Sequence, residues 1–236
     1  MIEFVAETGS TNADLLARLS DGDRVAEGRW LVARRQSAGR GRQGRTWFDG
    51  SGNFMGSTVV HVGESDPPAQ SLALLAGLAV YEAVLPLCPD PHSLRLKWPN
   101  DLLLGDAKLC GILLEGQGKA VVIGIGVNLA VAPDVPDRKT IALADVTAAP
   151  GVDEFAGSLA RCFDRELERW RTFGLEPLIR RWRAAGTREG TSLAVHEPDG
   201  AIASGTFAGL DDQGNLLLRL EDGRLRAIHA GDVTLA

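Results

Sequence analysis

The chain has 236 residues, of which 44% are hydrophobic and 24% charged, and its formal net charge is −6. This length can bury a core, the composition is ordinary for a soluble globular protein, and the acidic balance gives no general attraction for nucleic acid. No apolar run approaches the length needed to cross a bilayer, and the N-terminus lacks the basic and apolar regions of a signal peptide. We therefore expect a cytoplasmic protein.

The cysteines and histidines carry no pattern of their own. The three cysteines form no CxxC and lack the spacing of a disulfide framework, so we expect buried free thiols. The four histidines are scattered, and their spacing predicts no metal site. These residues are Cys88, Cys110, Cys162, His61, His92, His196 and His229.

The N-terminal part is predicted to contain short strands, one helix and a long loop. Residues 2–5 are a strand candidate, and residues 11–19 combine capping-box spacing of Thr11 and Asp14 with a helical apolar stripe. A second strand at 31–35 leads into a loop rich in glycine and arginine at 36–47.

The middle of the chain is predicted to supply most of a sheet. Residues 53–62 and 94–98 read as strands, the second with strict alternation of apolar and basic side chains. Residues 72–83 show the spacing of an amphipathic helix. A hairpin is predicted over 102–114, followed by a strand at 121–129.

The C-terminal part changes character after two predicted helices, at 155–170 and around 178–182. From Ser192 onward, short strand candidates are separated by turn-forming residues at 198–200, 212–215 and 221–223, the spacing of a small β-barrel. We expect a mixed α+β main domain over 1–188 and a small all-β domain over 189–236.

The loop bears an unusual density of arginine. Six arginines and no acidic residue lie between residues 29 and 45, which suggests a small anionic ligand. Gly39 to Gly44 formally satisfies GxGxxG, but turn residues rather than a helix follow, so the context of a dinucleotide site is missing. Arg40, Arg42 and Arg45 suit a loop that folds over carboxylate or phosphate. A solvated loop or a nucleic-acid contact stays open as an alternative.

The strand at 121–128 carries glycines on one face only. Because side chains alternate along a strand, Gly124, Gly126 and Asn128 share one face, and apolar side chains occupy the other. Glycine in a strand often marks the close approach of a ligand or of another backbone. We expect a ligand to lie across this face, with a bulge or tight packing as the alternative.

Polar and charged residues gather around the predicted hairpin. The segment Lys97 to Asp101 ends a strand in a proline-directed turn, which presents Asn100 and Asp101 at the sheet edge. Lys108 follows just before an apolar strand. It either reaches for water or supplies a fixed positive charge for a carboxylate or an α-phosphate, and local sequence does not decide between them.

Taken together, these segments resemble the biotin–protein ligase family. Five blocks match in order, and the tail at 230–233 fits the small SH3-like β-barrel of that family. The blocks are Gly9-Ser10-Thr11-Asn12, residues 36–47, Lys97-Trp98-Pro99-Asn100-Asp101, residues 108–113, and Gly124-Ile125-Gly126-Val127-Asn128.

The resemblance implies a role for each matching residue. It implies that Lys108, Arg42 and Asp101 are catalytic, although for Asp101 a base and a magnesium-positioning role both stay open. The implied biotin site is Ser10, Thr11, Asn12, Gln36, Gly39, Arg40, Gly41, Arg42, Lys108, Gly111, Gly124 and Gly126. The implied ATP site is Arg40, Arg42, Trp47, Lys97, Asn100, Lys108 and Asn128, with Trp47 stacked on adenine.

The resemblance also implies the fold and the reaction. The fold would be α+β, a mixed and largely antiparallel sheet packed by helices, as in class II synthetases. With ATP and Mg²⁺, biotin would become biotinyl-5'-AMP with release of pyrophosphate. Biotin would then pass to a lysine of the biotin carboxyl carrier protein of a carboxylase such as acetyl-CoA carboxylase.

The position of the first block bears on DNA binding and assembly. Ser10 to Asn12 lie so near the start that we expect no DNA-binding domain and no repressor function. The sequence does not decide between a monomer and a homodimer.

Other readings remain beside this one. A lipoate–protein ligase would use the same adenylation chemistry, and an RG loop could contact nucleic acid. A catalytically dead binding protein is disfavoured because Lys108, Arg42 and Asp101 are all present.

Overall fold

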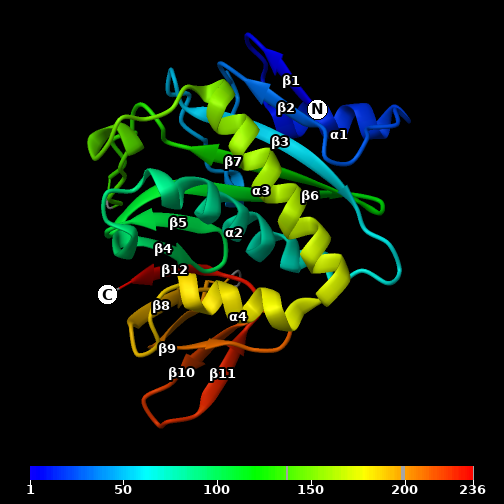
Figure 1. The fold of residues 1–236 in the computed structure, drawn as a ribbon. Helices are drawn as coiled ribbons and strands as arrows, with labels where there is room; N and C mark the ends of the chain where they lie inside the picture. Colours follow the sequence, from blue (N-terminus) through cyan, green and yellow to red (C-terminus); the bar gives the residue numbers. More distant parts are fainter. Residues whose placement is uncertain (137, 198–199, 236) are drawn as a thin grey trace.

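The computed structural model describes residues 1–136, 138–197 and 200–235. A seven-stranded sheet carries helices, and a five-stranded antiparallel sheet lies at one end of it (Figure 1). This is the predicted α+β arrangement with a small β domain at the C-terminus.

The large sheet has the strand order β1-β2-β3-β7-β6-β5-β4. Only β1 and β2 run parallel, so the sheet is largely antiparallel as predicted. Its strands are β1 (Ile2–Val5), β2 (Trp30–Ala33), β3 (Phe54–His61), β4 (Leu94–Lys97), β5 (Asp101–Leu104), β6 (Ala107–Gln117) and β7 (Ala120–Val127).

Helices cover the two faces of this sheet unequally. The larger hydrophobic core lies between the sheet and helices α2 and α3. A second, smaller cluster of buried side chains lies between α1 and the opposite face of the sheet. The α-helices are α1 (Thr11–Ser20), α2 (Leu72–Val84), α3 (Val152–Phe173) and α4 (Leu175–Ala185). Short 3₁₀ turns are η1 (Arg42–Gly44), η2 (Ala69–Ser71), η3 (Leu85–Leu87), η4 (Pro91–Ser93) and η5 (Leu143–Asp145).

The alternation predicted for β7 is confirmed. Ile123, Ile125 and Val127 belong to the core under α2 and α3. Val122 belongs to the cluster under α1. Because successive side chains point to opposite faces, the two glycines of β7 lie on the α1 side of the sheet.

The capping prediction for the first helix is wrong by one residue. Ser10 is the N-cap, and its hydroxyl accepts a hydrogen bond from the backbone N–H of Ala13 at 3.5 Å. Asp14 does not complete a capping box, since its carboxylate accepts a hydrogen bond from the Thr8 hydroxyl at 2.5 Å. Thr11 is the first helical residue, which leaves its hydroxyl free to contact the sheet.

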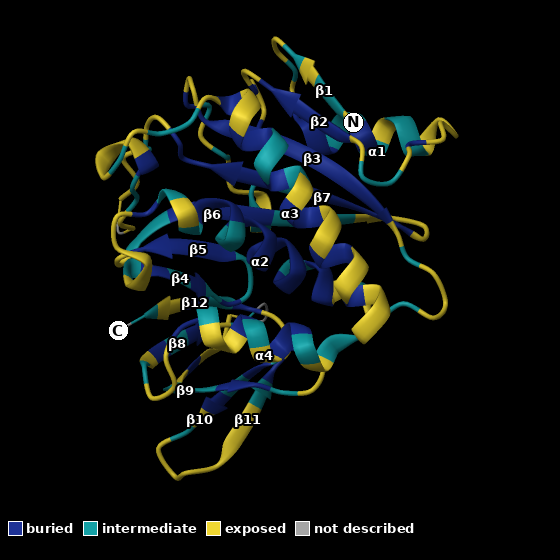
Figure 2. Cartoon of the chain, viewed as in Figure 1, coloured by how far each residue is buried: buried dark blue, intermediate teal, exposed yellow. Residues whose placement is uncertain are grey.

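One apolar segment is longer than the sequence analysis allowed. By length and composition alone, Ala69–Leu87 could cross a membrane, with a mean hydropathy of 1.5 over 19 residues, but 61% of that window is buried inside the protein. Figure 2 shows α2 largely buried, packed between the sheet and α3. The segment therefore has the burial of a core helix.

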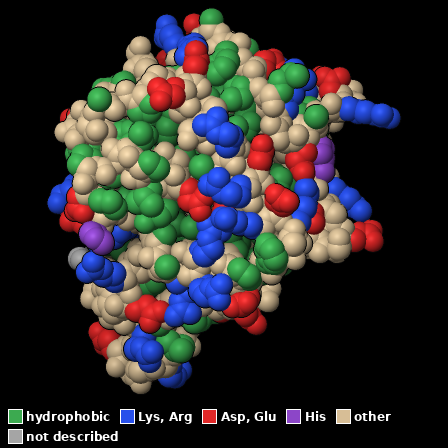
Figure 3. Space-filling model, in the orientation of Figure 1, with side chains coloured by type: hydrophobic (Ala, Val, Ile, Leu, Met, Phe, Trp, Pro, Cys, Tyr) green, Lys and Arg blue, Asp and Glu red, His purple; other side chains and the backbone are tan. Residues whose placement is uncertain are grey.

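Ion pairs join α2, α3 and α4. Glu166 on α3 is fully buried, and its carboxylate accepts hydrogen bonds from Arg169 at 2.7 Å and from Arg181 of α4 at 2.5 Å. Glu82 of α2 pairs with Arg165 at 2.5 Å and also with Arg181. Figure 3 shows basic and acidic side chains intermixed over the face that α3 and α4 form. A buried carboxylate needs such partners, and here they join α4 to α2 and α3.

The small sheet follows α4 and has the order β11-β10-β9-β8-β12. Its strands are β8 (Ser192–His196), β9 (Ile202–Leu210), β10 (Leu216–Arg219), β11 (Leu225–Ile228) and β12 (Asp232–Leu235). The turns predicted at 212–215 and 221–223 join its antiparallel strands, whereas the one at Pro198 and Asp199 lies outside the described residues. Within the described part of the chain no pairing joins β11 to β12, so a closed barrel and a boundary at residue 188 remain predictions.

Candidate active site

A cavity of about 1030 Å³ opens on the α1 side of the large sheet. Its walls come from the start of α1, the loop after β2, strands β3 to β7, residues of the segments 133–136 and 138–140, and strand β12. The structure brings together every predicted site residue around this cavity except Gly39, which is not among the lining residues.

The glycine face forms the floor of the cavity. A Cβ atom on Gly124 would lie 2.3 Å from the Asn12 carboxamide oxygen, and one on Gly126 would lie 2.2 Å from the Trp47 indole. A Cβ on Gly111 of the neighbouring strand would lie 2.8 Å from the same indole. The groups that approach this face closely are therefore the protein's own side chains, and a ligand lying across it stays a prediction.

A buried ion-paired cluster occupies the cavity next to this floor. The Asp101 carboxylate is 2.9 Å from the Lys97 ammonium and 2.5 Å from the Lys108 ammonium. Burial by itself would raise the pKa of Asp101, but the two ammonium groups stabilise its ionised form more strongly and bring that pKa to about 2. Asp101 is thus a fixed negative charge that positions two lysines.

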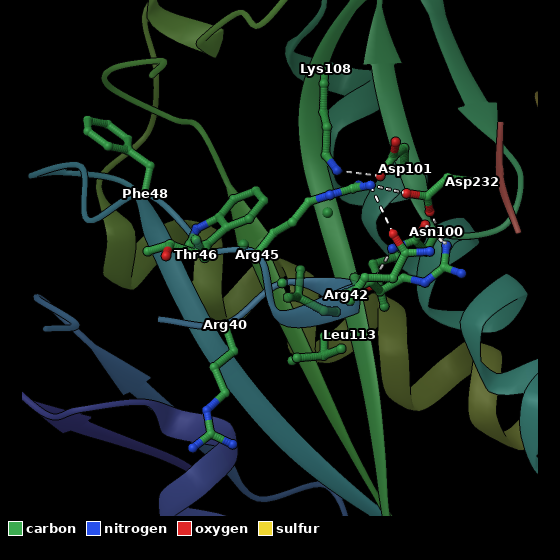
Figure 4. Close-up of a pocket in the computed structure, with 18 of the residues that line it drawn as sticks. Arg40, Arg42, Arg45, Thr46, Phe48, Asn100, Asp101, Lys108, Leu113 and Asp232 are labelled. Carbon is green, nitrogen blue, oxygen red and sulfur yellow. Dashed lines mark hydrogen bonds and ion pairs between the residues drawn. The ribbon is translucent and has the colours of Figure 1, made fainter. Parts of the chain in front are cut away.

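The loop of residues 36–47, called the arginine loop below, contacts the C-terminal sheet next to this cluster. Arg42 donates to the Asn100 side-chain oxygen at 3.0 Å and to the Gly231 carbonyl at 3.2 Å, and its guanidinium is 3.3 Å from the Asp232 carboxylate. Arg45 pairs with the same carboxylate. Figure 4 shows both side chains directed toward this group.

Arg40 takes a different direction from its two neighbours. In Figure 4 its side chain points away from Arg42, Arg45 and Lys108. Its guanidinium is 3.8 Å from the Glu115 carboxylate on β6. Of the cationic side chains that the sequence suggested for an anionic ligand, Arg42, Arg45 and Lys108 therefore lie at one end of the cavity, together with Lys97. Arg40 does not join them.

Hydroxyl and amide groups line the opposite end of the cavity. The Gln36 side-chain oxygen accepts from the Thr11 backbone N–H at 2.7 Å. The hydroxyls of Thr11 and Ser57 are 2.6 Å apart, and Ser57 donates to the Asn12 side-chain oxygen at 2.6 Å. Asn12 in turn donates to the Glu115 carboxylate at 2.8 Å.

The two predicted nucleotide-site asparagines are partly engaged with the protein. Asn100 donates to the Ile112 carbonyl at 2.6 Å, and Asn128 donates to the Ile141 carbonyl at 3.2 Å. The Asn128 side-chain oxygen is buried and has no hydrogen-bond partner in the described part of the chain. A buried acceptor without a donor is costly, so this oxygen is suited to a donor on a ligand.

Several lining residues were missed by the sequence analysis. Ser57 lies on the predicted strand at 53–62, and its register opposite Gly124 places it on the glycine face. Asp232 belongs to the predicted tail, and nothing local indicates that the tail reaches the cavity. Arg138 lines the cavity from a loop without a pattern. Strand alternation could have flagged Ser57, but only the fold identifies the other two.

The carboxylates around the cavity do not form a metal cage. Among the residues that the structure describes, no group of three or more His, Cys, Asp or Glu could hold a metal ion. Asp101 and Asp232 are both paired with cationic side chains.

Comparison with known proteins connects this geometry to a family. The pattern of the Biotin/lipoate A/B protein ligase family matches residues 8–128, and that of the Biotin protein ligase C terminal domain matches residues 194–235. The Biotin–[acetyl-CoA-carboxylase] ligase of Paracoccus denitrificans is 38% identical over 98% of this chain and 98% of its own. The ligase of the same name from Mycobacterium tuberculosis is 39% identical over 98% of this chain and 88% of its own.

A solved structure shows the same fold. The biotin protein ligase from Aquifex aeolicus in complex with biotin and ATP matches with a TM-score of 0.86. At 24% identity the match covers 100% of this chain and 98% of that one.

The cationic cavity, lined by residues of the large mixed sheet and of the small sheet, is the candidate active site, and the chain belongs to the Biotin/lipoate A/B protein ligase family. Within this family its nearly full-length relatives are biotin–[acetyl-CoA-carboxylase] ligases. These relatives support a biotin–protein ligase and not the lipoate alternative.

Proposed function

We propose that the chain joins biotin to ATP as biotinyl-5'-AMP, releases pyrophosphate, and transfers biotin to a lysine of a biotin carboxyl carrier protein. The observation that carries this proposal is a single cavity with a polar end at Thr11 and Gln36 and a cationic end at Lys97 and Lys108. Such a cavity suits an elongated ligand with a polar head and a carboxylate tail.

The chemistry needs positive charge because both reactants are anions. The biotin carboxylate must attack the α-phosphate of ATP, and cationic side chains that are already oriented lower the barrier for that approach. In this proposal Lys108 and Arg42 contact the carboxylate and the α-phosphate. Trp47 stacks on adenine, while Lys97, Asn100 and Asn128 bind the rest of the nucleotide.

The head of biotin is proposed to bind at the opposite end. Ser10, Thr11, Asn12 and Gln36 contact the polar ring, and Gly124 and Gly126 give space along the floor. The loop residues Gly39, Arg40 and Gly41 then close over the ligand, with Gly111 beside the chain that bears the carboxylate. A closed loop keeps water from the mixed anhydride until the acceptor lysine arrives.

Magnesium is proposed to enter as part of the nucleotide. Mg²⁺ usually keeps several waters and binds through one or two carboxylates and substrate phosphates. The paired state of Asp101 and Asp232 fits an ion carried by ATP better than a resident one.

Asp101 is proposed to position Lys97 and Lys108 rather than to act as a base. A carboxylate with a pKa of about 2 is a poor acceptor for a proton from the attacking amine. Its two short ion pairs instead hold both ammonium groups in the cavity. The acceptor lysine must then arrive in its neutral form.

A labelling assay tests the proposed function. The enzyme is incubated with Mg²⁺, ATP and either biotin or lipoate, together with a biotin carrier domain or a lipoyl domain, and products are read by mass spectrometry. We expect biotin on one lysine of the biotin carrier domain only. Lipoate on the lipoyl domain, without biotin transfer, would contradict the proposal and support the second enzyme considered above.

A further inference from the structure

One cationic side chain in the cavity wall has no anionic partner. Arg138 is exposed and lines the cavity, and it forms no ion pair with any residue that the structure describes. The other five lysines and arginines that line the cavity each pair with a carboxylate. Lys97 and Lys108 share Asp101, Arg42 and Arg45 share Asp232, and Arg40 faces Glu115.

Pairing decides how much charge each of these groups offers to a ligand. Two cations that share a carboxylate keep a single net positive charge between them, and Arg40 with Glu115 keeps none. A phosphate that binds a paired cation must also compete with the carboxylate already there. Arg138 instead offers its full charge, on a planar guanidinium group whose geometry suits two phosphate oxygens at once.

The backbone next to Arg138 is fixed beside Lys108. The Lys108 N–H donates to the Lys139 carbonyl at 2.9 Å, and the Ile141 N–H donates to the Lys108 carbonyl at 3.1 Å. Arg138 directly precedes Lys139, so its side chain starts close to the backbone of Lys108. Lys108 is the lysine proposed above to contact the carboxylate and the α-phosphate. Arg138 is therefore placed for a group that continues from the α-phosphate toward the exposed rim.

The part of ATP that needs such a cation is the part that leaves. In adenylate formation a biotin carboxylate oxygen forms a bond to the α-phosphorus, while the bond from this phosphorus to the oxygen that bridges to the β-phosphate breaks. The electron pair of the broken bond stays on the bridging oxygen, so pyrophosphate leaves with an added negative charge and no proton is transferred. A cation that is already oriented toward the β- and γ-phosphates stabilises this charge as it forms.

We propose that Arg138 binds the β- and γ-phosphates of ATP and stabilises them as the pyrophosphate leaving group. This inference rests on the proposed function and adds a residue to it, since Lys108 and Arg42 are assigned there to the carboxylate and the α-phosphate. The exposed position of Arg138 suits a product that leaves the cavity. Because Arg138 has no carboxylate to release, phosphate binding breaks no ion pair of this residue.

Neutralising Arg138 and its neighbour separately tests this contact. Arg138→Gln and Lys139→Gln each remove one positive charge from adjacent exposed residues, but only Arg138 is among the residues that line the cavity. The exchange of labelled pyrophosphate into ATP is measured with biotin and Mg²⁺, at varied concentrations of ATP and pyrophosphate. The binding of biotinyl-5'-AMP, which lacks the β- and γ-phosphates, is measured by calorimetry for the same proteins.

We expect Arg138→Gln to raise the KM for ATP and for pyrophosphate about tenfold, while Lys139→Gln stays within about twofold of the wild type. The affinity for biotinyl-5'-AMP should be the same in all three proteins, which also verifies that they fold.

Three results would overturn the inference. The first is equal KM values in the two variants, and the second is an Arg138→Gln variant that loses as much affinity for biotinyl-5'-AMP as for ATP. The third is a defect confined to transfer onto the carrier domain, which would assign Arg138 to the carrier protein instead. A wild type that forms no adenylate from biotin would contradict the proposed function itself.

A second measurement needs no variant. Phenylglyoxal modifies exposed arginines, and peptide mass spectrometry gives the rate of modification at each one. Arg24 is the reference, because it is exposed, is not among the lining residues and has no ion pair among the described residues. We expect pyrophosphate with Mg²⁺ to slow the modification of Arg138 several-fold and to leave that of Arg24 unchanged. An Arg138 rate that pyrophosphate does not alter would contradict the contact, whatever the variants do.

Discussion

At the scale of single residues, the cavity depends on two lysines that share one buried carboxylate. Lys97 and Lys108 would repel each other without Asp101 between them. The sequence predicted that charge gathers here, because the residues flank one hairpin. It could not predict the ion pairs, since two strands must pair before Lys108 meets Asp101. Glu115 was missed because alternation gives the face on which a side chain lies and not its partner, whereas alternation could have placed Ser57 on the glycine face.

Lys108→Ala should remove the positive charge nearest the reacting groups. We expect the rate of adenylate formation to fall by about 10²-fold or more, measured as pyrophosphate released in a single turnover. Lys119→Ala is the matched control, because Lys119 is exposed and pairs only loosely with Glu64 at 3.5 Å. A Lys108→Ala enzyme as fast as this control would remove Lys108 from the reaction.

Asp101 should make the stability of the protein depend on acid pH. The pKa of Asp101, about 2, is below the ordinary value of 3.8. The ionised carboxylate therefore stabilises the fold above about pH 4, and this contribution is lost as the pH falls toward 2. The wild type should lose up to about 2 kcal/mol of unfolding free energy from this group over that window. Asp101→Asn should lack this component, and should be less stable at neutral pH because two lysines lose their anion.

Chemical unfolding at several pH values measures both effects. Asp222→Asn, at an exposed turn of the small sheet, is the control and should keep the acid dependence of the wild type. An Asp101→Asn variant with an unchanged slope between pH 4 and 2 would contradict the ion-pair account.

At the scale of elements, the loop between β2 and β3 decides how the cavity is covered. Strands β3, β6 and β7 and helices α2, α3 and α4 all appear where sequence periodicity predicted them. The loop has no period, so the opposite directions of Arg40 and Arg42 could not be predicted. The start of α1 was misassigned by one residue, because Thr11 uses its hydroxyl for a contact with β3 that local sequence does not contain.

Arg42→Gly should weaken the closure of this loop. The substitution removes contacts to Asn100, Gly231 and Asp232, of which the guanidinium–carboxylate pair is charge-assisted. We expect the adenylate to escape about tenfold faster and to label unrelated proteins, measured by mass spectrometry of a protein mixture.

Arg34→Gly provides the comparison for this loop variant. Its guanidinium pairs with Asp153 at 2.5 Å, away from the cavity, so adenylate retention should stay as in the wild type. If Arg42→Gly remained as selective for its carrier as Arg34→Gly, the proposed role of the loop would be wrong.

At the scale of the whole molecule, the small sheet completes the cavity. Lys97 donates to the Val233 carbonyl at 3.0 Å, and Trp98 donates to the Gly214 carbonyl at 3.1 Å. A change in composition after residue 190 predicted a separate β domain. Its contact with the cavity could not be predicted, because it joins residues more than a hundred positions apart that share no local pattern.

Asp232→Asn should loosen the arginine loop without touching its sequence. Arg42 and Arg45 both pair with this carboxylate, and a partly exposed pair contributes about 1 kcal/mol or less. We expect backbone amides of residues 39–47 to exchange hydrogen several-fold faster than in the wild type, measured by mass spectrometry. Asp212→Asn, at a turn of the same sheet, should leave that exchange unchanged, and equal rates in both variants would contradict the contact.

The central claim is that one cavity brings biotin and ATP together. The direct measurement is to mix the purified enzyme with biotin, ATP and Mg²⁺, without any carrier, and to quantify the bound products by mass spectrometry. We predict one biotinyl-5'-AMP per cavity, formed together with an equal amount of pyrophosphate, and none when lipoate replaces biotin. Pyrophosphate without adenylate, or an adenylate formed equally well from lipoate, would contradict the account.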